Sequence, residues 1–140
     1  MAATEISLRD DAFVQISFTN NKKFTFFGTE YNNVYIGSNG YLTFGRGDRM
    51  YYSHRYYHFI LPRISAMFTN LNPAHPSSGK IHYEQTADSF IVTFTHIKTY
   101  SGNYFFTFQV GRGPRRHAKP CPESHRAPPV TPNLADCGWI

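Results

Sequence analysis

The sequence has little charge, few cysteines and no long apolar run. Charged residues make up only 16% of its 140 residues, and no apolar run is long enough to cross a bilayer, so no membrane span is predicted. Residues 1–11 contain neither a basic nor an apolar segment and predict no secretory signal. The two cysteines, Cys121 and Cys137, both lie near the carboxyl terminus. They could pair in an oxidising compartment, but that disulfide would not crosslink the aromatic part of the chain.

Motifs of the common enzyme classes are also absent. Ser38 lies in Gly-Ser-Asn-Gly and not in the Gly-x-Ser-x-Gly of a nucleophile elbow, and there is no His-Glu-x-x-His and no phosphate-binding glycine loop. Between residues 34 and 110 the only acidic residues are Asp48, Glu84 and Asp88. These are too few to assign an acid–base pair, so the sequence predicts a non-catalytic protein.

Aromatic residues, in contrast, are abundant. They account for 17% of the chain, with 13 Phe and 10 Tyr, and aromatic side chains suit the half-buried surface of a pleated sheet. A chain of this length fits one domain with a single core. The net charge is +5, of which residues 111–140 supply +3 through five basic and two acidic residues. The positive charge therefore belongs mainly to the carboxyl-terminal segment.

The stretch Val34–Gly45 is the centre of the predicted fold. Two short apolar runs flank Asn39 and Gly40, a pair that favours the positive φ angles of a two-residue type I′ turn. The stretch is therefore predicted to form a β-hairpin. Because an isolated hairpin is marginal in water, it needs other strands to pack against.

The remaining sequence supplies such strands. The clearest is residues 89–97, where Phe90, Val92 and Phe94 alternate with β-branched residues and are predicted to share one face. Residues 45–58 are predicted to form a long loop. Further strands are predicted at residues 13–18, 24–27, 64–68, 81–83 and 104–110. Seven to nine short strands without a helix of credible length predict an all-β fold, an antiparallel β-sandwich spanning residues 1–110.

Residues 111–140 differ sharply in composition from the rest. This segment holds six of the nine prolines, and its only aromatic residue is Trp139. It cannot bury enough apolar surface to offset the entropy cost of ordering. It is therefore predicted to be a disordered tail.

Five segments together resemble the nidogen-like β-sandwich module of secreted, multidomain surface and matrix proteins. They follow one another in the order of that family and are residues 24–31, 34–45, 61–73, 79–83 and 90–94. The resemblance implies an extracellular or cell-surface module without catalytic activity, which supports adhesion or assembly with a protein or glycan partner. Family members typically continue into further strands, so a truncated, non-functional fragment of a larger surface protein is the alternative that the resemblance leaves open.

Arg46, Gly47 and Asp48 spell the tripeptide that integrins recognise. Their position after the hairpin, in a glycine-rich loop, would present them well to a partner. A Gly-x-Gly-Asp turn between strands explains the same three residues through backbone conformation alone, and this second interpretation is the stronger one.

The loop at residues 49–59 interleaves aromatic and basic side chains. Its candidate binding residues are Tyr51, Tyr52, Arg55, Tyr56 and Tyr57. Such a surface could stack against sugars or single-stranded nucleic acid. The alternative, that the rings cover one end of the sandwich, is the stronger interpretation. A nucleic-acid site would also need both basic regions of the chain on one face, so this partner is disfavoured.

No cofactor is predicted, and calcium is the metal with the most support. Oxygen ligands suitable for calcium lie at four turn positions, Asp10, Asp11, Asp48 and Asp88. They match no recognised calcium-loop spacing. Four zinc-type ligands lie in the tail, at His117, Cys121, His125 and Cys137, and their spacing matches no zinc motif.

Overall fold

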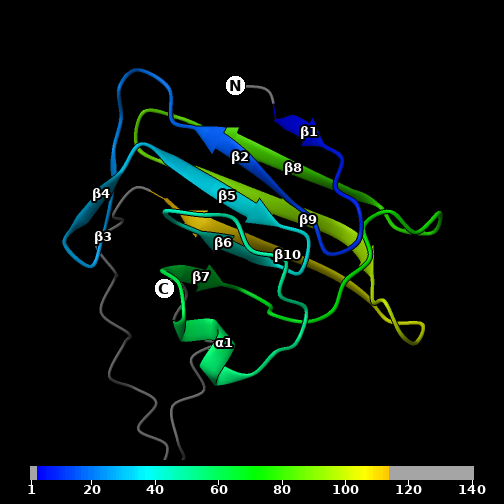
Figure 1. Ribbon diagram of the computed structural model, residues 1–140. Coiled ribbons are helices and arrows are strands. Elements are labelled where there is room, and N and C mark those ends of the chain that lie inside the picture. The colour runs from blue at the N-terminus through cyan, green and yellow to red at the C-terminus, as the bar shows by residue number, and fades with distance from the viewer. Residues whose placement is uncertain (1–2, 114–140) are drawn as a thin grey trace, which may run out of the picture.

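The computed structural model describes residues 3–113, and it confirms an all-β fold. These residues form ten strands and one five-residue helix (Figure 1). The elements are β1 (Thr4–Ile6), β2 (Phe13–Ser17), β3 (Phe24–Phe26), β4 (Thr29–Tyr31), β5 (Asn33–Gly37), β6 (Tyr41–Thr43), α1 (Arg55–Phe59), β7 (Arg63–Ser65), β8 (Lys80–Gln85), β9 (Phe90–Lys98) and β10 (Phe105–Arg112).

The strands build a sandwich of two four-stranded sheets. One sheet has the order β1-β8-β9-β10 and the other the order β2-β5-β6-β7, while β3 and β4 form a separate two-stranded hairpin. Neighbouring strands pair antiparallel throughout these sheets. Figure 1 shows β2, β5, β6 and β7 in front of the other sheet, with the β3–β4 hairpin projecting from one end. The predicted antiparallel sandwich is confirmed.

The core lies between the two sheets and is lined by alternate residues of their strands. Burying an aliphatic or aromatic side chain of this kind contributes about 1.5–3 kcal/mol. The side chains that form this core are, from the front sheet and the residue after β6, Val34, Ile36, Leu42 and Phe44, and from the other sheet Ile81, Phe90, Val92, Phe94, Ile97 and Val110. The predicted shared face of Phe90, Val92 and Phe94 is therefore confirmed.

Strand β9 changes its alternation near its end. Phe94 pairs with Phe108 and Ile97 pairs with Phe106, so β9 takes three residues where β10 takes two. The extra residue forms a β-bulge at His96, whose φ of 53° is positive. The bulge keeps Ile97 in the core although it follows Phe94 by an odd number of residues.

The turn of the central hairpin differs from the prediction. Gly37 pairs with Tyr41, which leaves a three-residue loop, and only Gly40 in it has a positive φ, of 86°. The amide of Gly40 donates to the carbonyl of Gly37 at 3.3 Å. The prediction of a two-residue type I′ turn is therefore wrong. The loop is a type I turn followed by a glycine in the left-handed conformation. A Cβ atom at Gly40 would lie 1.9 Å from the carbonyl oxygen of Met67, so close approach as well as φ requires glycine.

Several other boundaries also differ. The sequence did not predict strands β1 and β4 or helix α1, and the strand predicted at residues 64–68 is the shorter β7. Gly111 and Arg112 belong to β10, so the strand continues past the predicted domain boundary at residue 110. Residues 114–140 of the predicted tail lie outside the described residues, and they include the candidate ligands His117, Cys121, His125 and Cys137.

Candidate binding surface

The long segment between β6 and β7 carries a cluster of aromatic rings. The rings of Tyr52, His54 and Tyr57 lie 6.1–6.4 Å apart, and Tyr56 contacts Tyr57 at 5.4 Å between centroids. Tyr52 is 59% exposed and Tyr56 is 65% exposed. We call Tyr52, His54, Tyr56 and Tyr57 the aromatic platform. Its members belong to helix α1 or directly precede it.

The short helix forms because its first turn is capped. His54 has extended backbone angles, and its Nδ1 accepts a hydrogen bond from the amide of Tyr56 at 3.2 Å. The backbone amide of His58 donates to the carbonyl of His54 and closes the turn. One turn is too short to produce a 3.6-residue hydrophobic period, which explains why sequence reasoning missed α1.

Arg63 lies beneath the platform and joins its parts. Its side chain is fully buried, forms an ion pair with Asp48, and donates to the carbonyl of Tyr57 at 3.1 Å. The guanidinium lies 4.2 Å from the ring centroid of Tyr41 and 4.7 Å from that of Phe68. Arg63 therefore ties β7, the loop after β6 and helix α1 together.

Sequence reasoning missed Arg63, although the chain contains a signal for it. Arg63 is the only charged residue (Asp, Glu, Lys or Arg) in the sequence between Arg55 and Lys80. A single arginine in an apolar stretch is a candidate buried cation, because a charge in such surroundings needs a partner. The sequence does not show which carboxylate pairs with it.

Tyr41 supports the same loop from the hairpin. Its hydroxyl donates to the carbonyl of Met50 at 2.9 Å and approaches the carbonyl of Asp48 at 3.2 Å. Burial raises the pKa of Tyr41, and the carboxylate of Asp48 adds to this effect while Arg63 opposes it. The phenol therefore stays protonated and remains a hydrogen-bond donor to the loop.

Asn39 connects the hairpin turn to three other segments. Its fully buried side chain donates to Asp11 Oδ1 at 2.9 Å and to the carbonyl of Met50 at 3.2 Å, and it accepts from the amide of Leu71 at 2.8 Å. Sequence reasoning gave Asn39 only a turn role. Its side chain also holds the loop, the amino-terminal segment and the segment after β7 against the sandwich.

The predicted integrin tripeptide forms a packed turn. Arg46 is exposed, and its carbonyl accepts a hydrogen bond from Thr43 at 2.8 Å. A Cβ atom at Gly47 would lie 2.3 Å from the ring of Phe13. The carboxylate of Asp48 is only 17% exposed, pairs with Arg63, and also accepts from the amides of Arg49 and Met50. This carboxylate is already used within the fold, which supports the conformational interpretation of the tripeptide.

The other predicted binding residues lie around the platform. Tyr51 and Arg55 are exposed, while Tyr57 is half-buried. Arg49 lies 5.7 Å from the ring centroid of Phe13. Because Arg63 is buried and paired, the cations of the segment between β6 and β7 that face solvent, among the residues that the structure describes, are Arg46, Arg49 and Arg55.

The aspartates proposed as calcium ligands lie in different parts of the fold and make different contacts. Asp11 accepts from Asn39 and Asp48 pairs with Arg63, whereas Asp88 lies in the turn between β8 and β9. Burial and the neighbouring Asp11 raise the pKa of Asp10. Within residues 3–113 no three His, Cys, Asp or Glu side chains are placed to hold a metal ion. Calcium binding stays a prediction.

His58 gives this region a pH-dependent contribution to stability. Its Nδ1 lies 3.3 Å from Ser65 Oγ, and burial together with the charge of Arg63 lowers the pKa of His58 from the ordinary 6.5. The unfolded chain therefore binds the proton more readily than the folded one. The stability that neutral His58 supports is present above pH 6.5 and is lost as the pH falls through the lowered value.

We expect the melting temperature of the wild-type chain to fall more between pH 7.5 and pH 5 than that of the variant His58→Gln. Glutamine keeps a polar group near Ser65 but does not titrate, so the difference between the two curves isolates His58. Thermal unfolding followed by circular dichroism measures both. Parallel curves for the two proteins would contradict this assignment.

The fold and its long loop define a class of protein, an antiparallel β-sandwich module with exposed aromatic rings on one loop. Comparison with protein families agrees: the model of a family described as NIDO related matches residues 1–111. The chain belongs to this NIDO-related family, and the resemblance to a nidogen-like module is confirmed. Neither the curated proteins nor the solved structures gave a match.

The family suggests a module of extracellular type and is not known as catalytic. Among residues 3–113 no helix is long and apolar enough to cross a membrane.

Proposed function

We propose that this chain is a non-catalytic adhesion or assembly module that binds an extracellular protein or a glycan through the aromatic platform. The observation that carries the proposal is the exposure of Tyr52 and Tyr56 within one connected cluster of rings. Tyrosine offers a large amphipathic contact area at a low cost in conformational entropy, which is why it is enriched at binding surfaces.

The support beneath the platform strengthens this proposal. The buried ion pair of Arg63 and Asp48 and the bond from Arg63 to the carbonyl of Tyr57 hold helix α1 in place before any partner arrives. A surface that is already ordered loses less entropy when it binds. The buried ion pair therefore fixes the position of a loop whose rings face solvent.

The distribution of charge favours a protein or glycan over nucleic acid. A protein that binds nucleic acid needs several cations along the path of the backbone. The exposed cations of the segment that carries the platform are Arg46, Arg49 and Arg55, and Arg49 is associated with the ring of Phe13. Three arginines are a small electrostatic footprint for such a partner.

The test compares two pairs of exposed tyrosines on the full chain. Tyr52→Ala with Tyr56→Ala removes the two exposed tyrosine rings of the platform. Tyr100→Ala with Tyr104→Ala removes rings that are 57% and 70% exposed around the turn between β9 and β10. Binding is measured on an immobilised panel of purified extracellular-matrix proteins and neutral glycans. We expect the platform variant to bind its panel partner about tenfold or more weakly, and the control variant to bind like wild type.

Thermal unfolding must show that both variants fold, because only then does a loss of binding report on the surface. Wild-type chain that binds no member of the panel would contradict the proposal. Equal binding by the platform variant would also contradict it.

A further inference from the structure

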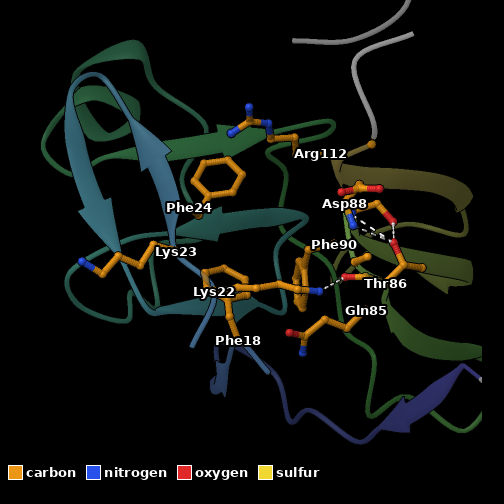
Figure 2. Close-up of a pocket in the computed structure, with 12 residues that line it drawn as sticks. Phe18, Lys22, Lys23, Phe24, Gln85, Thr86, Asp88, Phe90 and Arg112 are labelled. Carbon is orange, nitrogen blue, oxygen red and sulfur yellow. Dashed lines mark hydrogen bonds between the residues drawn. The ribbon is translucent and has the colours of Figure 1, made fainter. Parts of the chain in front are cut away.

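A concave surface lies between the β3–β4 hairpin and the turn that joins β8 to β9. It is a cleft of about 410 Å³ that shares no residue with the aromatic platform. Figure 2 shows its side chains converging from β3, from the turn between β8 and β9, and from the end of β10. The cleft therefore offers a binding site that is independent of the proposed platform function.

The floor of the cleft is aromatic. Phe18 lies 6.3 Å from Phe24 in a stacked arrangement and meets Phe90 edge-on at 5.5 Å. Phe18 and Phe24 are only half-buried, so part of their apolar surface faces the cleft. Such rings can pack against the C–H face of a sugar or another flat, partly apolar ligand.

The rim of the cleft carries more positive than negative charge. Lys22, Lys23 and Arg112 line it together with one carboxylate, Asp88. Lys23 is paired with Glu30. Lys22 donates to the carbonyl of Thr86 and has no ion-pair partner among the described residues. Among residues 3–113, Arg112 makes no ion pair, and its guanidinium lies 5.3 Å from the ring centroid of Phe24.

Arg112 and Lys22 approach the aromatic floor from two sides, as Figure 2 shows. An anionic group between them would gain charge-assisted hydrogen bonds, and a carboxylate could accept two bonds from the planar guanidinium. The same cleft contains the carboxylate of Asp88 and the hydroxyls of Thr86 and Ser89, which bond each other at 2.7 Å. These oxygens favour a ligand that also brings hydroxyl donors.

We infer that this cleft binds an acidic oligosaccharide. A sugar ring lies against Phe18 and Phe24, the acid group pairs with Arg112 and Lys22, and ring hydroxyls donate to Asp88. An acidic sugar offers an anionic group, several hydroxyl donors and a flat C–H face in one small unit.

The experiment measures binding of the full chain to three oligosaccharides by isothermal titration calorimetry. A hyaluronan hexasaccharide carries carboxylates only, a heparin hexasaccharide carries carboxylates and sulfates, and cellohexaose is neutral. We expect at least one acidic sugar to bind and cellohexaose to bind about tenfold or more weakly. The two acidic probes distinguish a carboxylate from a sulfate as the group that Arg112 and Lys22 recognise.

Matched variants locate the site. Arg112→Gln should weaken binding of the acidic sugar about tenfold, because it removes a charge-assisted pair, whereas Arg9→Gln removes one exposed positive charge outside the cleft and should leave binding unchanged. Both positions are exposed, so neither change should prevent folding. Equal losses of binding in the two variants would show that net charge alone attracts the sugar, and would overturn the inference. Tight binding of cellohexaose, or no binding of either acidic sugar, would also overturn it. Tyr52→Ala with Tyr56→Ala should leave this binding intact, which separates the inference from the proposed function.

Discussion

Replacing Asp48 with alanine is expected to lower the free energy of unfolding by about 3–5 kcal/mol, because it leaves the guanidinium of Arg63 buried without its counter-charge. The side chain of Arg63 is 0% exposed and cannot reach water in the folded state. Its Nε and Nη1 already lack hydrogen-bond partners among the described residues. Among the described residues, Asp48 supplies the carboxylate that pairs with Arg63.

Denaturant unfolding of wild type and Asp48→Ala measures this loss. Glu30→Ala is the control, since it breaks the ion pair between Glu30 and Lys23. Both side chains of this pair are more than half exposed. Solvent screens exposed pairs, so the control should unfold almost like wild type. A loss in Asp48→Ala as small as that in Glu30→Ala would contradict the role assigned to the buried pair.

A double variant tests whether the cost arises from the orphaned charge. In Asp48→Ala combined with Arg63→Met the cation is gone, and methionine can pack between Tyr41 and Phe68, where the guanidinium now lies. Part of the lost stability should return in the double variant. If the double variant is less stable than Asp48→Ala, the stacking of Arg63 on the two rings matters more than its charge.

Replacing Asn39 with alanine should also destabilise the fold strongly. The change leaves the buried amide of Leu71 without its acceptor, which costs about 1–3 kcal/mol by itself, and removes the donors to Asp11 and Met50. Asn103→Ala, at an exposed turn position, is the control and should be close to neutral. Denaturant midpoints measure both variants.

A second substitution at this position separates the hydrogen bond that Asn39 accepts from the two that it donates. Asn39→Asp keeps an acceptor for the amide of Leu71 but places a carboxylate beside Asp11 Oδ1, now 2.9 Å from the side-chain nitrogen. Its stability should therefore rise at acid pH relative to wild type, as one of the two carboxylates takes up a proton. A variant Asn39→Ala that unfolds like wild type would contradict the connecting role of Asn39.

Local patterns in the sequence were enough to predict the sandwich. The alternation of Phe90, Val92 and Phe94 with other residues predicted the buried face of β9. In a strand, every second side chain faces the core, so a short stretch of sequence is enough to show the pattern. Strand β1 was not predictable in this way. It is only three residues long, and its partner β8 lies more than seventy residues away in the chain.

The candidate site was harder to predict because its supports are non-local. Arg63 pairs with Asp48 across 15 positions, and Asn39 bonds Leu71 across 32. The Asn39–Gly40 pair favours a two-residue turn by local propensity, but the tertiary bonds of Asn39 and the approach of Met67 to Gly40 select a longer one. Sequence reasoning found the exposed tyrosines of the loop but not what holds them in position.

The central claim is that a partner contacts the aromatic platform, and hydroxyl-radical labelling of the full chain tests it most directly. Tyrosines are labelled in the free chain and in the chain bound to the matrix protein or neutral glycan that retains it most strongly. We predict that Tyr52 and Tyr56 lose most of their labelling on binding, while Tyr100 and Tyr104, which are similarly exposed, keep theirs. Unchanged labelling of Tyr52 and Tyr56, with protection elsewhere on the chain, would contradict the claim.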